Sequence, residues 1–373
     1  IGLGIPAEPL FRSRDYWKTV HSEVICFLFI FFFVLLRCSL EGEMSFMTKT
    51  LRAFLNMFLV IPFLIKFAKD KGFGSEKQIV RALMITCMIA SIVTFICLLN
   101  PSFQLYVKQV MIKYSEEDYL YNNEYRGYGI ANLMTSNFGY VLGFMAGLGC
   151  FYLKENRWFI YCIPFMVFAA MINARTGVLI AAVVIAVFFI VGKKTGYSFV
   201  VLLISILFLS YFESLMSLFL VSDRTADWIY SFTDQVTASL KAGDVTLSTA
   251  GNLLFEEMII WPDNLEQWLF GRGYDIFISH GGVIKSDNGW VRQLNFGGVF
   301  YILLLYGSLI MLFRRLRNYK NSQYMLVFLL TFVIVNTKTS CFPGDSMFLL
   351  LFMMYYFQIS RPVERMNGRL QFV

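Results

Sequence analysis

The sequence has little charge. Only 15% of its 373 residues are Asp, Glu, Lys or Arg, whereas 57% are hydrophobic and 18% are aromatic. The mean hydropathy is +0.61, and water-soluble domains of this size do not have such a composition. The scarcity of charge therefore excludes a single water-facing domain.

Histidine is rare and the cysteines are not clustered. The chain has 2 His and 7 Cys, and no CxxC pair or nearby histidine indicates a metal site, so we expect neither a metal nor a cofactor. Most cysteines fall inside apolar runs, where they are expected to pack as small apolar residues. Cys38 and Cys341 are both expected near the outer face of the membrane, where they could meet.

Strict alternation of apolar and polar residues is also absent, which argues against a membrane β-barrel. Apolar runs instead recur along nearly the whole chain, separated by short polar segments. We therefore predict an all-α, polytopic membrane helix bundle of about ten spans. The predicted spans are Val24–Leu40, Leu51–Phe67, Ala82–Leu99, Ala131–Leu153, Trp158–Ile172, Gly177–Val191, Phe199–Leu220, Val299–Phe313, Tyr324–Val335 and Met347–Phe357.

Three regions follow from these spans. We expect an N-terminal transmembrane bundle at residues 1–220, an external lid loop at 221–292 and a C-terminal transmembrane bundle at 293–373. The sequence begins at Ile1 rather than at Met, which is typical of a fragment or a processed product, and no signal-peptide pattern precedes the first span. In the fourth span, glycines at intervals of four predict a helix face that a neighbour can approach closely. These are Gly139, Gly143 and Gly147.

Lys and Arg gather in alternate short loops, which are expected to stay on the cytoplasmic side. The remaining loops, including the turn at Arg175 and the lid loop, then face the outside. The net charge of +7 lies largely in the cytoplasmic loops, near anionic lipid headgroups, and needs no nucleic-acid partner. The basic loops contain Lys69, Lys71, Lys77 and Arg81; Lys154 and Arg157; Lys193 and Lys194; Arg314, Arg315, Arg317 and Lys320; and Arg361, Arg365 and Arg369.

The lid loop carries interfacial features. Residues 222–243 have apolar side chains at helical spacing, which predicts an amphipathic helix lying along the membrane surface. Trp228, Trp261 and Trp268 suit an interfacial belt, and Pro262 with Asn264 marks a break followed by a new helix start. This pattern alone favours a lid that covers hydrophobic surface.

The stretch "LFGRGYDIFISHGGVIKSDNGWVRQLNFGGVF" resembles the bacterial O-antigen polymerases of the Wzy type, in the superfamily that also contains the O-antigen ligases. The resemblance rests on the "FGRG" turn at 270–273, on "SDNGW" around Asp287, and on Gly297 and Gly298 before the next span. Ligases usually carry His at the position of Asp287. Arg175 and Arg126 also resemble family arginines, although Asn137 stands where the family's RX10G pattern has Gly.

The resemblance implies a membrane glycosyltransferase of lipopolysaccharide biosynthesis. It would join O-antigen repeat units carried on undecaprenyl pyrophosphate, at the periplasmic face of the bacterial inner membrane. Lipid-linked donor and acceptor oligosaccharides are the implied partners, and a chain-length regulator is a further candidate. Because guanidinium groups bind phosphate oxygens in a bidentate manner, Arg175 is the first candidate for stabilising the leaving pyrophosphate. Arg126, Arg272, Arg292 and Lys338 are the further candidates.

The acceptor hydroxyl also needs a general base, for which Asp287 is the first candidate and His280 the second. Each candidate has a simpler explanation that the sequence leaves open. Arg175 could extend to the membrane interface from a helix end, Asp287 or Ser286 could merely cap the next helix, and His280 or Lys338 could be a plain loop residue.

Two other functions share much of this pattern. An O-antigen ligase would transfer glycan to the lipid A core, and the Asp at position 287 argues against it. A flippase or transporter of the lipid-linked oligosaccharide is expected to show repeated halves, which the sequence lacks.

Overall fold

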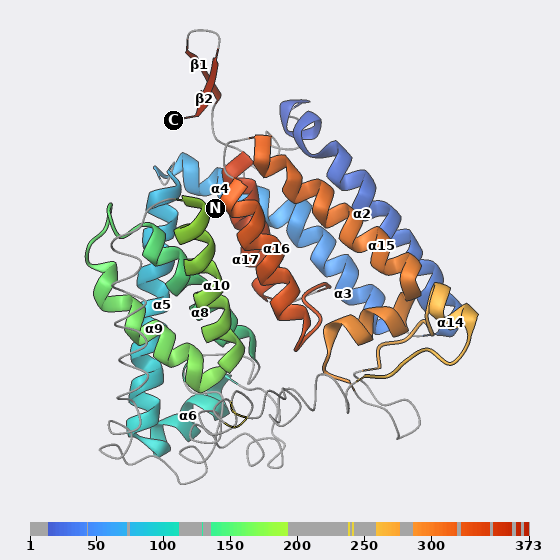
Figure 1. The fold of residues 1–373 in the computed structure, drawn as a ribbon, viewed down its shortest axis with the longest axis horizontal. Coiled ribbons are helices and arrows are strands. Elements are labelled where there is room, and N and C mark those ends of the chain that lie inside the picture. Colours follow the sequence, from blue (N-terminus) through green and yellow to red (C-terminus); the bar gives the residue numbers. More distant parts are fainter. Residues whose placement is uncertain are drawn as a thin grey trace, which may run out of the picture. The chain divides into compact units, whose positions relative to one another are not determined.

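The computed structural model describes residues 14–42, 44–72, 75–111, 129, 136–192, 238, 241, 259–276, 286–318, 322–343, 346–359, 363–366 and 369–372. The chain divides into two compact units (Figure 1). Unit 1 comprises Ile1–Glu76 and Met258–Val373, and unit 2 comprises Lys77–Glu257. The division into regions 1–220, 221–292 and 293–373 stays a prediction.

Unit 1 consists of helices and one small hairpin. Its elements are α2 (Arg14–Glu41), α3 (Met44–Leu55), the π-helix η1 (Asn56–Val60), α4 (Ile61–Asp70), α14 (Leu265–Phe270), α15 (Gly289–Asn318), α16 (Ser322–Asn336), α17 (Ser346–Ile359), β1 (Val363–Met366) and β2 (Arg369–Phe372). The two strands pair antiparallel, with Val363 opposite Phe372. The sequence analysis does not predict this hairpin, although the helical class that it predicts holds for the rest of the described chain.

In the described residues of unit 2, all regular secondary structure is helical. The helices are α5 (Glu76–Leu99, whose first residue belongs to unit 1), α6 (Pro101–Met111), α8 (Ser136–Phe151), α9 (Phe159–Asn173) and α10 (Arg175–Gly192). A core cluster joins the end of α5 to α6 and to the α9–α10 turn through Cys97, Val107 and Ile172.

Four helices are long and apolar enough to cross a membrane. They are His21–Glu41, Phe46–Asp70, Glu76–Leu99 and Gly289–Leu316, and each contains one of the predicted spans. Five further apolar helices coincide with predicted spans but have only 10–17 residues, fewer than the roughly 20 that a helix needs to cross a bilayer. The count of about ten spans therefore stays a prediction, and Phe199–Leu220 lies outside the described residues.

The second long helix changes its winding in the middle. α3 continues through η1 into α4 without a break, and Pro62 follows the π-helical turn at once. Proline has no N–H, and its ring collides with the carbonyl four residues earlier. The wider π turn moves the carbonyl of Phe58 away, so the helix accommodates Pro62 and keeps its course.

The helix ends of unit 1 sort into two sets. At one end, which we call the α14 end, Arg37 of α2 donates to the carbonyl oxygen of Gly271 at 2.8 Å. At the other, the Arg315 end, Arg315 of α15 contacts Glu23 of α2, and Gln358 of α17 donates to Glu76 at 2.5 Å. These sets match the loops predicted to be external and cytoplasmic, respectively. Which side of a membrane each end faces stays a prediction.

Glycines bring two helices of unit 2 into backbone contact. A Cβ on Gly139 would lie 2.7 Å from the Cβ of Ala174, one on Gly147 would lie 2.7 Å from that of Val184, and one on Gly143 would overlap the backbone of Gly177. The predicted close-approach face of the fourth span is thus confirmed, and α10 is the neighbour that uses it.

Candidate functional site

The "FGRG" turn packs against a break in α15. Gly298 has φ 67° and ψ −168°, so α15 is two helical segments joined at this glycine. A break leaves carbonyls of the preceding turn without helical donors, and these carbonyls need other partners away from water. The turn supplies them: the N–H of Arg272 donates to the Asn295 carbonyl at 2.5 Å and that of Gly273 to the Phe296 carbonyl at 2.9 Å.

The backbone conformation of this turn requires glycine at two positions. Gly271 and Gly273 have φ of 75° and 82°, in the left-handed region that other residues adopt only with strain. A Cβ on Gly271 would also overlap the backbone of Phe296. The spacing of the motif is therefore explained by its docking to the broken helix, before any chemistry is considered.

Arg292 forms an ion cluster with the buried Asp275 and with Lys49, two residues that no sequence pattern indicated. Its Nε and Nη2 donate to the two carboxylate oxygens of Asp275 at 2.9 and 2.6 Å. Lys49 of α3 places its Nζ 3.6 Å from the same carboxylate, whose side chain is only 1% exposed. The bidentate pair fixes the turn after α14 to the first segment of α15.

Arg272 is held by three acceptors. Its Nε donates to the Asn295 side chain at 3.0 Å and its Nη2 to the Trp261 carbonyl at 3.3 Å. The same Nη2 lies 3.1 Å from an exposed carboxylate oxygen of Asp263. Arg272 thus binds the start of α14 to the broken helix, and the predicted helix start after Pro262 is confirmed, because the Asn264 side chain caps α14 by accepting from the N–H of Gln267 at 2.9 Å.

Asp287 is not the cap of α15. The neighbouring Asn288 takes that role, since its Oδ1 accepts from the N–H groups of Trp290 and Val291 at 3.0 and 3.4 Å. Ser286 supports this cap by accepting from the N–H of Asn288 at 3.2 Å. The carboxylate of Asp287 instead lies 3.6 Å from the Nζ of Lys338, and both side chains are about one-third exposed, at 36% and 34%.

Buried amides and hydroxyls lie under this pair. Gln293 Oε1 accepts from the Tyr306 hydroxyl at 2.8 Å and from Asn336 Nδ2 at 3.4 Å. Gln293 Nε2 donates to the Phe342 carbonyl at 3.3 Å, and Asn336 Oδ1 accepts from the N–H of Cys341 at 2.7 Å. The network joins α15, α16 and the 337–343 turn, so the two elements that carry Asp287 and Lys338 are held together.

Arg175 is the first residue of α10 in unit 2. Only Ala174, in an extended conformation, separates it from α9, and the N–H of Ala174 donates to the Ala170 carbonyl at 2.6 Å. The guanidinium-bearing residue is half-buried. A cation in the first helical turn meets the positive end of the helix dipole, so helix formation gives no reason for an arginine here.

The remaining candidates differ in what the structure says of them. Arg126 and His280 lie outside the described residues, and so does most of the predicted interfacial helix at 222–243. Arg272, Asp287, Arg292 and Lys338 all lie at the α14 end of unit 1, on the first segment of α15 or on segments packed against it. Cys38 and Cys341 are both buried, and no disulfide joins them.

Within the described ranges, no group of three or more His, Cys, Asp or Glu side chains is placed to hold a metal ion. Searches of protein-family models, curated proteins and solved structures with this chain found no match. Function is therefore inferred from the residues themselves and from the family resemblance of the motifs.

Proposed function

We propose that this chain is a membrane glycosyltransferase that polymerises O-antigen repeat units linked to undecaprenyl pyrophosphate, at the periplasmic face of the bacterial inner membrane. The observation that carries the proposal is the place of Arg175, the first residue of a helix in an apolar chain. A bound anion would be stabilised there both by the guanidinium and by the positive end of the helix dipole. The pyrophosphate of a lipid-linked sugar is such an anion, and it lies at the membrane surface.

In this proposal Arg175 binds the pyrophosphate as it leaves. The acceptor hydroxyl forms a bond to the anomeric carbon of the donor sugar, and the bond from that carbon to the pyrophosphate oxygen breaks. The departing oxygen takes the electron pair, so negative charge grows on the diphosphate in the transition state. A fixed guanidinium in a partly dehydrated place stabilises that charge without reorganising.

Asp287 is the proposed base that accepts the hydroxyl proton. The cap assignment supports this role, because Asn288 satisfies the N–H groups of the helix start and leaves the neighbouring carboxylate for other use. The Nζ of Lys338 lies 3.6 Å from the Asp287 carboxylate and so places a positive charge beside it. Arg292 and Arg272 already hold carboxylates, and we assign them to positioning the loop rather than to direct phosphate contact.

The lipopolysaccharide ladder of a cell that lacks the endogenous gene tests the proposal. Cells complemented with Arg175→Ala should cap their lipopolysaccharide with a single repeat unit, and Arg175→Lys should restore little, because lysine keeps the charge without the fork. Arg157→Ala, at an exposed position in the turn before α9, is the matched control and should give a normal ladder.

Asp287→Asn should remove most polymerisation while the amount of folded protein stays normal. Full-length ladders from Asp287→Asn would contradict the role of Asp287 as the base. Full-length ladders from Arg175→Ala would contradict the proposed function itself. Loss of every repeat, with long lipid-linked chains accumulating, would indicate a ligase. Loss of every repeat without such chains would indicate a flippase.

A further inference from the structure

A cavity opens between α2 and α15 at the Arg315 end of unit 1. It measures about 330 Å³ and is lined by Ser22, Glu23, Met311, Leu312, Arg314 and Arg315. A single water needs only about 10–15 Å³ of such space, and ligand pockets usually begin at roughly 300 Å³. The cavity therefore has room for a polar group of several heavy atoms. It lies at the opposite end of unit 1 from Asp287.

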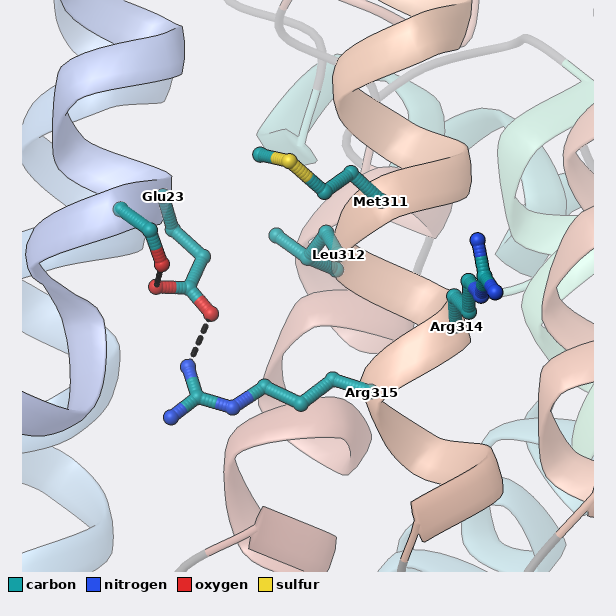
Figure 2. Close-up of a pocket in the computed structure, with 6 residues that line it drawn as sticks. Glu23, Met311, Leu312, Arg314 and Arg315 are labelled. Carbon is teal, nitrogen blue, oxygen red and sulfur yellow. Dashed lines mark hydrogen bonds and ion pairs between the residues drawn. The ribbon is translucent and has the colours of Figure 1, made fainter.

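The inner wall of the cavity is a neutralised ion pair. Glu23 is 3% exposed, and Arg315 pairs with one of its carboxylate oxygens (Figure 2). The Tyr355 hydroxyl donates to the same oxygen at 3.2 Å, and Ser22 donates to the other oxygen at 2.8 Å. A carboxylate with these donors has little need of a further cation, which argues against a metal or an amine as the occupant.

The lining of the cavity carries a net positive charge. It has two guanidinium groups, of Arg314 and Arg315, and one carboxylate, of Glu23, which leaves a net charge of +1. Arg314 is exposed, and no residue in the described part of the chain forms an ion pair with it. The charge of the site thus favours an anion, and the planar fork of arginine favours phosphate oxygens.

Apolar side chains continue from the cavity along the same two helices. On α2, Ile25 and Phe29 follow Ser22 at helical spacing and are 45% and 64% exposed. On α15, Met311 is 47% exposed and the neighbouring Ile310 is 53% exposed. A soluble anion would make no contact with this apolar surface. A lipid whose phosphate enters the cavity would pack its acyl chains against it.

We propose that the cavity binds the headgroup of an anionic phospholipid, with the phosphate near Arg314 and the acyl chains beside α2 and α15. Basic pockets between membrane helices recognise headgroups in this manner. The site is separate from the proposed polymerase chemistry, and it does not depend on it. It would fix the lipid that covers the junction of α2 and α15.

Native mass spectrometry of the purified full chain in detergent tests this site with phosphatidylglycerol and phosphatidylethanolamine as probes. Phosphatidylglycerol should be retained in preference, and Arg314→Gln should weaken its binding about tenfold or more, as expected for loss of one charge-assisted contact. Arg81→Gln removes an exposed arginine of α5 and should leave the affinity unchanged. Met311→Trp keeps the charge, narrows the cavity with a bulkier side chain and should also weaken binding.

Four results would overturn the site. Equal retention of the two lipids would show that charge does not select the occupant. Normal phosphatidylglycerol binding by Met311→Trp, or equal losses in Arg314→Gln and Arg81→Gln, would place the lipid elsewhere. Displacement of phosphatidylglycerol by millimolar inorganic phosphate would show that the pocket takes a free anion. None of these outcomes changes the expected lipopolysaccharide ladder, so the two proposals fail separately.

Discussion

The two units hold their helices together by different means. In unit 2, Gly143 and Gly177 let α8 and α10 meet backbone to backbone, and no polar group is needed at the contact. In unit 1, α15 is joined to its neighbours through Arg292, Gln293 and Asn295, which bind side chains and carbonyls of other segments. Small residues supply packing, whereas buried polar residues in an apolar protein are costly and mark places where geometry is fixed for a purpose. The difference therefore directs attention to the α14 end of unit 1.

The largest expected effect comes from Asp275. Asp275→Asn leaves the guanidinium of Arg292 and the ammonium of Lys49 without their buried carboxylate, which should lower the free energy of unfolding by about 3–5 kcal/mol. Asp263→Asn, at the exposed partner of Arg272, should cost only about 0–1 kcal/mol. Thermal unfolding of the two purified variants measures the difference. Equal losses would mean that burial of the ion cluster contributes nothing.

A smaller loss is expected in unit 2 from a single methyl group. Gly143→Ala forces a Cβ into the backbone of Gly177 and should destabilise the fold by about 3 kcal/mol, at the upper part of the usual range for overpacking. The same change at Gly307 of α15, where a Cβ meets nothing within 4 Å, should be neutral or stabilise by up to about 1 kcal/mol. Unfolding midpoints in one detergent give both values. A Gly143→Ala variant as stable as Gly307→Ala would contradict the backbone contact.

The smallest effect separates two adjacent residues. Asn288→Ala removes the cap of α15 and should cost about 1 kcal/mol, whereas Asp287→Ala breaks only a partly exposed pair and should cost less than about 1 kcal/mol. On polymerisation the order should reverse, with Asp287→Ala the more severe. Melting curves and lipopolysaccharide ladders of the same two variants check this reversal. If Asp287→Ala were the less stable protein, the cap assignment would be wrong.

Local patterns in the sequence predicted the local features of the fold. The glycine spacing of α8 and the restart at Asn264 follow from rules that act within one or two helical turns, and the structure confirms both. The sequence leaves open that Asp287 or Ser286 caps the next helix, whereas the cap is Asn288. Three polar residues in a row satisfy the capping rule equally well, and only the backbone geometry separates them.

The ion cluster could not be read from the sequence. Lys49 and Asp275 lie 226 positions apart and join only because α2, α3 and α15 pack together. The predicted span Val299–Phe313 begins directly after Gly298, whereas α15 starts at Gly289. A short helix made polar by Gln293 and Asn295 has no apolar run to identify it.

The contact of Gly143 with Gly177 has a consequence for Arg175, which lies two residues earlier in the chain. Because the two main chains touch there, neither a lipid nor a side chain can enter between α8 and α10 at this contact. The position of the Arg175 backbone is therefore fixed by this helix contact, and only the rotamer of its side chain can vary. Gly143 takes no part in the chemistry, yet the contact it allows determines where the positive charge of Arg175 lies.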